Sequence, residues 1–239
     1  MKKLFLFFII VFCTKMLHAQ SGYNYAPFGV ELGASSVRSY GNLRKTFNNT
    51  AFNLNALYNF TPYIPVAAEL QMGTLSGGSN SDKTIDPYGR QSTNGYKAFM
   101  LHVDLQAGEI MDYDDSFFLR VLKNFYVGTG IGVIQNKMTF IQRLDPYDPG
   151  YVFPGTNSSI NIMLPLRFGY EVKFYNAYDE PSFALNVGYR HNILFGEGMD
   201  GYDDPSAKFK NNALDQYRQI SVSIKYYFGD VASYTKNIR

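Results

Sequence analysis

Cysteine is nearly absent from this sequence of 239 residues, and tryptophan is entirely absent. The single cysteine, Cys13, lies in an N-terminal segment that we expect to be removed, so the mature chain has no disulfide, thiolate metal site or cysteine nucleophile. Long hydrophobic runs are also lacking, because no stretch beyond that segment reaches the ~18 continuous apolar residues of a membrane-spanning helix. The sequence therefore excludes a disulfide-stabilised protein and a helical membrane protein.

The N-terminal segment has the pattern of a secretory signal. Lys2 and Lys3 precede an unbroken apolar run over residues 4–12, and the small residue Ala19 follows a short polar stretch. The run is too short to span a bilayer as a helix, which takes ~20 apolar residues. We therefore predict a signal peptide over residues 1–19 and a single mature domain over residues 20–239.

An excess of charge of either sign is lacking in the mature chain. Loss of the signal removes Lys2, Lys3 and Lys15, which leaves 19 of the 22 basic residues against 20 acids. A near-neutral chain has no electrostatic basis for binding nucleic acid, so no such partner is expected.

Aromatic residues and glycine are abundant, with 20 Tyr, 20 Phe and 21 Gly, a composition that favours β-sheet over helix. Around residue 54 the side chains alternate: Phe52, Leu54 and Ala56 form an apolar face, and Asn53 and Asn55 form a polar one. The same alternation of period two predicts eight strands, at residues 28–35, 52–60, 66–73, 99–108, 125–134, 160–174, 183–190 and 220–228.

The connections between these segments alternate in length. Long polar loops are expected at 38–49, 76–95, 136–158 and 194–216, and short turns at 61–63 and 175–181. Long loops on one side and short turns on the other are typical of outer-membrane barrels, with both termini on the periplasmic side. The link 109–123 is long for a periplasmic turn, which indicates either a short helix over residues 116–124 or a count of ten strands. We predict an all-β, eight-stranded, antiparallel up-and-down transmembrane β-barrel, with ten strands as the alternative.

The polar faces decide between a membrane barrel and a soluble one, which would place its apolar face inside. They consist of Asn, Gln, Ser and Gly with few charges, unlike the Lys- and Glu-rich surface of a soluble sheet. We expect the apolar face to meet lipid and the polar face to fill a narrow lumen, where charges must be paired. The predicted lumen network contains Glu31, Glu69, His102, Asp104, Arg167, Glu171, Lys173, Arg190 and Lys225.

Three further features bear on this barrel. Gly128, Gly130 and Gly132 point inward and are expected to leave room for arginines and tyrosines of other strands. Pro165 removes a ladder hydrogen bond, so we expect either a bulge there or a strand that begins near it. The aromatic residues are expected near strand ends, in girdles at the two membrane interfaces: Phe28, Tyr58, Phe60, Phe99, Phe125, Tyr170, Phe174, Tyr189, Tyr226 and Phe228.

The strand patterns resemble a known group of proteins. Residues 30–33 (VELG), 125–132 (FYVGTGIG), 183–190 (FALNVGYR) and 220–229 (ISVSIKYYFG) look like the OmpA-barrel-like or OmpX-like small outer-membrane barrels of the Bacteroidota type. The resemblance implies location in the outer membrane of a Gram-negative bacterium. It also implies that barrel-insertion machinery recognises the aromatic end of the last strand, Tyr227 and Phe228, although the ten residues after Gly229 depart from that pattern.

Candidate chemical sites are few. His102 with Asp104 could orient an imidazole, and His191 lies near the outer end of its strand, but no serine nucleophile motif accompanies them. The acids of one loop, Glu197, Asp200, Asp203 and Asp204, lack the spacing of a calcium loop. We expect no catalytic residue, cofactor or metal.

The function predicted from the sequence is that of a non-enzymatic integral outer-membrane protein. Its surface loops would serve adhesion, ligand contact or contact with a protein partner, and its other partners would be outer-membrane lipid and the barrel-insertion machinery. The alternatives are an accessory component of a secretion or assembly machine and a lipid-modifying enzyme acting at the rim. A pore is less favoured, because side chains fill an eight-stranded lumen.

Overall fold

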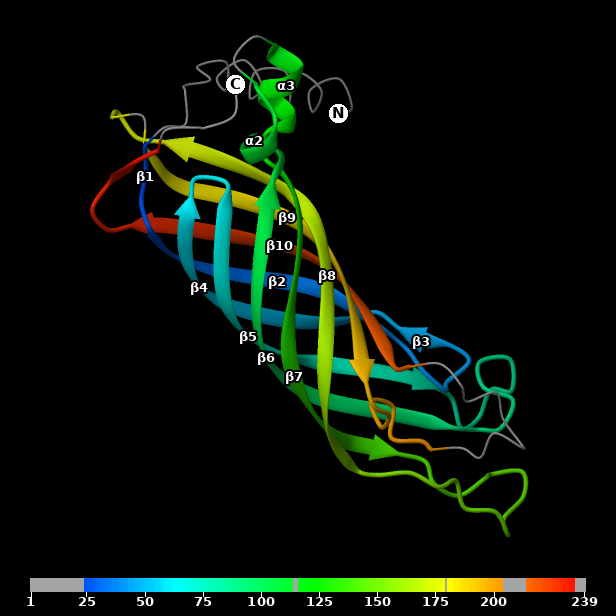
Figure 1. Ribbon diagram of the computed structural model, residues 1–239. Helices are drawn as coiled ribbons and strands as arrows, with labels where there is room; N and C mark the ends of the chain where they lie inside the picture. Colours follow the sequence, from blue (N-terminus) through cyan, green and yellow to red (C-terminus); the bar gives the residue numbers. More distant parts are fainter. Residues whose placement is uncertain (1–23, 114–115, 179, 204–213, 235–239) are drawn as a thin grey trace.

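A computed structural model describes residues 24–113, 116–178, 180–203 and 214–234, so the predicted signal peptide lies outside the described residues. These residues form a closed antiparallel barrel of eight strands (Figure 1), which confirms the predicted fold class and strand count. The barrel strands are β2 (Phe28–Tyr40), β4 (Asn49–Thr61), β5 (Ile64–Gly78), β6 (Gln91–Gln106), β7 (Phe125–Ile141), β8 (Ser158–Tyr175), β9 (Pro181–Phe195) and β10 (Gln216–Phe228).

Each strand pairs with the next along the chain, and the first pairs with the last. The closing ladder between β2 and β10 is unbroken from Phe28↔Phe228 to Tyr40↔Gln216. Closure leaves no free sheet edge among these strands, as a bilayer requires. Outside the barrel wall, β1 (Asn24–Tyr25) pairs with β11 (Ala232–Ser233), and the two-residue β3 (Thr46–Phe47) pairs with β5.

The long link before β7 is helical. It contains α2 (Ala107–Ile110) and α3 (Phe117–Leu122), which Figure 1 shows at the same end of the barrel as β1 and β11. The helix expected over residues 116–124 is therefore confirmed. Among the described residues, no helix is long and apolar enough to cross a membrane.

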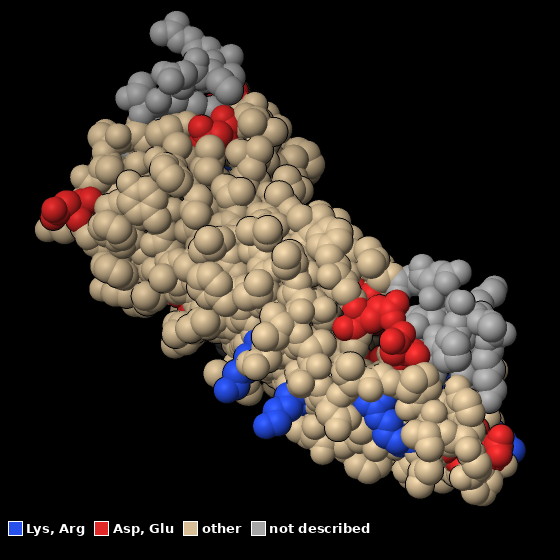
Figure 2. All heavy atoms as spheres, turned by 60° about the horizontal axis from the view of Figure 1, so that its bottom comes forward, with Lys and Arg blue, Asp and Glu red and all other residues tan. Residues whose placement is uncertain are grey.

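Side chains alternate between the two faces of the barrel wall. Outward apolar residues are strongly exposed, including Leu32 at 66%, Val127 at 61% and Ile224 at 59%, whereas their polar neighbours in sequence are buried. Figure 2 shows the middle of the wall almost free of charged residues, which gather toward the two ends. An exposed apolar belt around a closed barrel is the surface of an outer-membrane protein, and a soluble barrel would have the opposite orientation.

The strands are longer than the alternation predicted, mainly at the end with the long loops. For example, β6 begins at Gln91 rather than near residue 99, and β7 continues to Ile141. At the other end, the fourth predicted strand stops at Gln106 instead of residue 108, because α2 follows directly. Backbone pairing continues into a zone where the inner face stays buried, as at Tyr96, but the outer face carries polar residues such as Lys97 and Lys137, so the apolar–polar contrast disappears. The alternation in the sequence therefore predicted the lipid-facing part of each strand rather than its whole paired length.

Pro165 lies well inside β8, so both expectations about it were wrong. The strand begins seven residues earlier, at Ser158, and the register with β7 is the same on both sides of the proline, without a bulge. Instead, two pairs are missing from that ladder, between Thr129↔Leu166 and Gly132↔Met163. The Thr129 hydroxyl donates a hydrogen bond of 3.0 Å to the Pro165 carbonyl at the gap.

Aromatic rings form a belt mainly at the end of the barrel with the short turns. Phe28 contacts Tyr58 and Phe228, with ring centroids 5.6 and 6.2 Å apart, and Phe125 lies 4.6 Å from the Tyr170 ring. Phe99 and Tyr189 lie near the middle of β6 and β9 rather than near strand ends, which corrects their predicted placement. The girdle at the interface near the termini is well formed.

Candidate functional site

The centre of the lumen holds a cluster of buried ions. Two nitrogens of Arg190 on β9 donate to the two carboxylate oxygens of Glu69 on β5, at 2.7 and 2.5 Å. Arg167 on β8 approaches the same carboxylate at 3.3 Å. Glu69 is fully buried, and both guanidinium groups are nearly so, because β5, β8 and β9 all turn these positions inward. Such charges are tolerated only when paired.

Asp104 and His102 on β6 complete this central cluster. Arg167 binds Asp104 through Nε at 2.9 Å and Nη2 at 3.1 Å. Arg167 Nη1 also lies 2.9 Å from His102 Nε2. The same Nε2 lies 3.3 Å from Glu69 Oε2, and Nδ1 lies 3.8 Å from Asp104. His102 is 4% exposed, so the lumen network uses it and neither lipid nor solvent reaches it.

A second ion cluster lies nearer the termini. Lys225 on β10 donates to Glu171 on β8 at 2.5 Å, and the Tyr227 hydroxyl donates to the other carboxylate oxygen at 2.5 Å. Lys173 lies 3.9 Å from Glu171 and donates to the Pro62 carbonyl at 2.6 Å. This group closes the lumen where β8 meets the short turn between β4 and β5.

Glu31 departs from the expected pairing of charges in the lumen. Among the described residues, no basic side chain lies within 4.0 Å of it. Its carboxylate instead accepts hydrogen bonds from the Ser223 hydroxyl and from Asn186 Nδ2. The structure therefore places all nine predicted lumen residues on the inner face, eight of them in two ion clusters and Glu31 in a hydrogen-bonded position between strands.

The three inward glycines accommodate their neighbour β6 rather than arginines and tyrosines of other strands. A Cβ atom at Gly128 would lie 2.0 Å from Asp104 Oδ1, and one at Gly130 would lie 2.8 Å from the Cβ of His102. At Gly132 the nearest side-chain atom is the Cγ of Met100, at 2.5 Å. The expected space is present, but β6 side chains occupy it.

The half of the lumen toward the long loops contains an apolar cluster, which the alternation of the sequence did not reveal. A buried cluster there includes Tyr96, Met100, Ile134, Met163, Leu194 and Tyr217, with Met199 reaching in from the loop after β9. Tyr217 Oη donates to Gln71 at 3.0 Å, and Gln71 donates to Gln219 at 2.5 Å, which joins this cluster to the ions below. Tyr217 and Gln219 alternate in step with the inward Lys225. Extending the predicted last strand from residue 220 back to residue 217 would therefore have identified them as inward residues.

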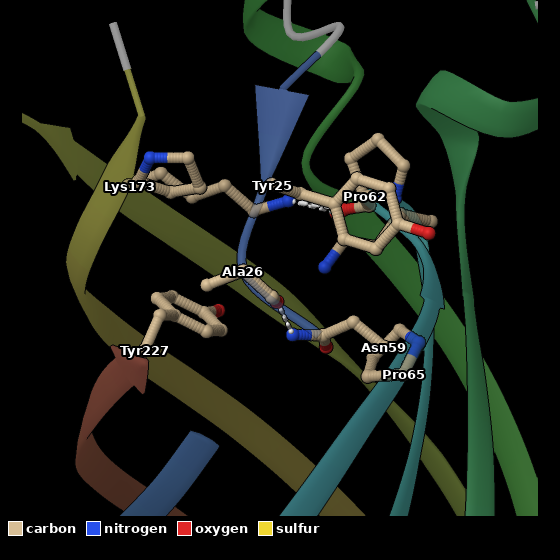
Figure 3. A pocket seen from close by; sticks show the side chains of 9 residues that line it. Tyr25, Ala26, Asn59, Pro62, Pro65, Lys173 and Tyr227 are labelled. Atoms are coloured by element: carbon tan, nitrogen blue, oxygen red, sulfur yellow. Dashed lines mark hydrogen bonds between the residues drawn. The ribbon is translucent and has the colours of Figure 1, made fainter. Parts of the chain in front are cut away.

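The opposite mouth of the lumen is also closed. Figure 3 shows the pocket at this end, lined by Tyr25, Asn59, Lys173 and Tyr227 among others, with Asn59 donating to the Ala26 carbonyl at 2.8 Å. Its volume is about 10 Å³, roughly the space of a single water molecule. Ions at the centre, an apolar cluster above and this constriction below leave no continuous channel through the described barrel.

The long loops fold together over the far mouth of the barrel. Tyr202, Phe153 and Leu43, each from a different loop, form a separate buried cluster. The guanidinium groups of Arg90 and Arg143 lie 5.7 and 5.8 Å from the Tyr202 ring. The Tyr202 hydroxyl lies 3.0 and 2.8 Å from the carbonyl oxygens of residues 91 and 142, within hydrogen-bond distance of both, which ties three loops together. We call residues 41–48, 79–90, 142–157 and 196–203 the loop cap.

An acidic pair lies at the base of the loop cap. Asp200 accepts hydrogen bonds from the backbone N–H groups of Asn42 and Tyr202, and Asp215 accepts one from Met199 at 2.9 Å. Burial and the neighbouring Asp200 carboxylate raise the pKa of Asp215 to about 7. Gly41 permits this approach, since a Cβ there would lie 2.8 Å from Asp215 and 2.9 Å from Asp200.

The remaining candidate residues do not assemble into a reactive site in the described part of the chain. His191 lies on the outer wall, with Nε2 2.8 Å from the Gln216 side chain. No group of three or more His, Cys, Asp or Glu is placed to hold a metal among the described residues; Asp204, one of the four acids considered for calcium, lies outside them.

Comparison with solved structures finds similar folds at low identity. The chain is similar to Neisserial surface protein A, at 12% identity over 85% of this chain and 98% of that chain, with a TM-score of 0.48. It is also similar to the attachment invasion locus protein Ail of Yersinia pestis, solved in complex with the heparin analogue sucrose octasulfate, at 12% identity over 87% and 100%, with a TM-score of 0.44. For OprG of Pseudomonas aeruginosa the values are 12%, 87% and 99%, and 0.37.

Sequence comparisons give no family assignment. A scan against protein-family models finds no match. A search of curated proteins finds none either. The Bacteroidota type suggested by the strand patterns therefore stays a prediction, and this chain forms a small, closed, eight-stranded outer-membrane β-barrel.

Proposed function

We propose that this protein is a non-conducting outer-membrane protein that uses its barrel as an anchor and its loop cap as a contact surface for a partner outside the cell. One observation carries the proposal: the lumen is filled by paired ions and apolar side chains, while the loops beyond it are folded around their own core. A filled lumen supports anchoring rather than transport, and ordered loops bind with less loss of conformational entropy than mobile ones.

The loop between β7 and β8 offers the most prominent contact surface. Leu144 and Val152 pair across a short antiparallel bridge and are 55% and 57% exposed. Tyr147 at the turn is 41% exposed, and the Lys83 ammonium lies 3.9 Å from its ring centre. Exposed aliphatic and aromatic side chains with an adjacent cation are typical of the core and rim of a protein interface.

Two measurements test the proposal. Planar bilayers containing the purified chain should show no large, steady single-channel conductance. Non-adherent Gram-negative cells displaying the protein should adhere to protein-coated surfaces, and Leu144→Ser with Val152→Ser should reduce this adhesion severalfold. Asp148→Asn, an exposed change in the same loop, is the matched control. Steady conductance, or adhesion that the double substitution leaves unchanged, would refute the proposed role.

The last strand supports a proposed interaction with the barrel-insertion machinery. β10 ends at Phe228, and Tyr226 and Phe228 stack with their ring centroids 6.1 Å apart on the outer face. Since β10 closes the barrel against β2, its backbone is free to pair with another protein until closure occurs. Truncation after Gly229 should leave assembly intact, whereas Phe228→Ser should slow it in a reconstituted insertion assay.

A further inference from the structure

Three neighbouring strands place basic and titratable side chains in one row on the outer wall. The register pairs Arg218 of β10 with Arg38 of β2 on one side and with His191 of β9 on the other. All three positions share the outward phase of the exposed residues Ile220 and Leu32. The row therefore faces the surroundings of the barrel, not the lumen.

This row lacks a counter-charge within the protein. In the described part of the chain, no carboxylate lies within 4.0 Å of Arg38 or Arg218. Arg38 is held in place by a hydrogen bond of 3.1 Å from its Nε to the Thr46 hydroxyl. Like charges directly opposite each other on adjacent strands are destabilising, so two facing arginines indicate an external anion that lies between them.

The height of the row on the wall identifies where such an anion would be. Phe28 and Phe228 lie in the aromatic belt near the termini. Arg38 lies ten residues along β2 from Phe28, and Arg218 lies ten residues along β10 from Phe228. A strand rises about 3.3 Å per residue, so with a tilt of about 40° ten residues climb about 25 Å. That equals the height of the apolar band of an outer-membrane barrel. The arginines thus lie at the headgroups of the outer leaflet.

A shallow groove, open over most of its extent, lies in the wall beside the arginines on their membrane side. It has a volume of about 460 Å³ and lies between β2, β4 and β10. Small side chains on β2, Ala34 and Ser36, create it between the larger Ile220 and Val222 of β10 and the polar Asn49 and Thr50. A groove with an apolar side, leading up to two cations, has the form of a site for an acyl chain below a phosphate.

We propose that this groove binds one molecule of a phosphorylated glycolipid of the outer leaflet. Its phosphate would lie between Arg38 and Arg218, accepting hydrogen bonds from both guanidinium groups, and one acyl chain would lie along Ala34, Ile220 and Val222. His191, at the end of the row, faces the same headgroup. The site depends on membrane insertion but not on the partner contact proposed for the loop cap, so either can fail without the other.

Lipid retention by the full-length chain tests the site. The folded protein is incubated in detergent with bisphosphorylated lipid A, exchanged into fresh detergent, and the bound lipid is counted by mass spectrometry. We expect about one lipid A per chain for the wild type and at least a tenfold loss for Arg38→Gln with Arg218→Gln. Ser36→Phe, which fills the groove and keeps both charges, should cause a comparable loss.

Controls separate this site from general attraction to anions. Lys97→Gln with Lys137→Gln removes two outward charges from β6 and β7, on the opposite side of the strand order, and should leave retention unchanged. Dephosphorylated lipid A and phosphatidylglycerol should not be retained, and millimolar inorganic phosphate should not displace bound lipid A. Equal loss in the lysine and arginine variants, retention of phosphatidylglycerol, or unchanged binding in folded Ser36→Phe would overturn the proposal.

Discussion

Removal of the Glu69 carboxylate should destabilise the barrel more than removal of the arginine that faces it. Among the described residues, Arg190 has no other carboxylate within 4.0 Å, so Glu69→Ala leaves a buried guanidinium unpaired, while Arg167 keeps Asp104. Loss of one partner from a buried ion pair costs about 3–5 kcal/mol. In Arg190→Ala, Glu69 still has Arg167 at 3.3 Å, and the lost charge-assisted hydrogen bonds are worth about 1.5–3 kcal/mol.

The free energy of unfolding is measured by urea titration of the refolded barrel in phospholipid bilayers, followed by far-UV circular dichroism because the chain has no tryptophan. Asp82→Asn, in an exposed loop, should change stability by less than about 0.5 kcal/mol and serves as the control. Glu69→Met combined with Arg190→Met should recover most of the loss, since neither charge is then left alone. A Glu69→Ala barrel within about 1 kcal/mol of wild type, or one more stable than Arg190→Ala, would refute the reasoning.

Three further predictions concern the loop cap, the inner wall and the helical link. The pKa of Asp215 is raised from 3.8 to about 7, so its contribution to cap stability is complete below about pH 4 and is lost as the pH rises through 7. Amide exchange in the cap, corrected for intrinsic rates, should therefore accelerate between pH 5 and 8 in wild type but not in Asp215→Asn. Gly128→Ala should cost about 1–3 kcal/mol by overpacking, whereas Gly95→Ala, whose Cβ would meet nothing closer than 3.5 Å, should be neutral or slightly stabilising in the same urea titration. Phe117 and Phe118 of α3 are more than 60% exposed, and the Val121 carbonyl accepts a hydrogen bond from Tyr170 on the outer wall. Nitroxide labels at the two phenylalanines should be reached by oxygen from the bilayer and be shielded from a water-soluble paramagnetic reagent; the opposite accessibility would show that α3 stands clear of the membrane.

Much of the fold could be predicted from the alternation of apolar and polar residues within individual strands. The alternation around Leu54 and Val127 identified strands, their outward face and the strand count, because lipid imposes the same demand on every second residue across the apolar band. The ends of the strands were predicted less accurately, as in β7, where Gln135 and Lys137 continue the ladder past the predicted end at residue 134. Pro165 also showed that a ladder can lose two pairs without a bulge when the other neighbour, β9, keeps its register.

The candidate site was only partly visible in the sequence. The inward phase correctly placed Glu69 and Arg190 in the lumen, but their pairing joins positions 121 residues apart, and no local pattern encodes which acid meets which base. The apolar cluster around Met163 was hidden because isolated apolar residues on a polar face look like exceptions until several strands bring them together. Tyr202, the centre of the loop cap, has no periodic context at all.

Whether a residue lies in the lumen or on an external surface determines which property a substitution there can test. The described lumen residues are buried and pack against one another, so substitutions such as Glu69→Ala report on stability. Function must then lie on surfaces that external molecules can touch, which are the loop cap and the outer wall. On both, the informative residues violate the local expectation: Leu144 is apolar where the surroundings are water, and Arg218 is charged at the edge of a wall that otherwise faces hydrocarbon. In our proposals, each exception is compensated by a contact from outside the chain, a partner surface for the first and an anionic headgroup for the second.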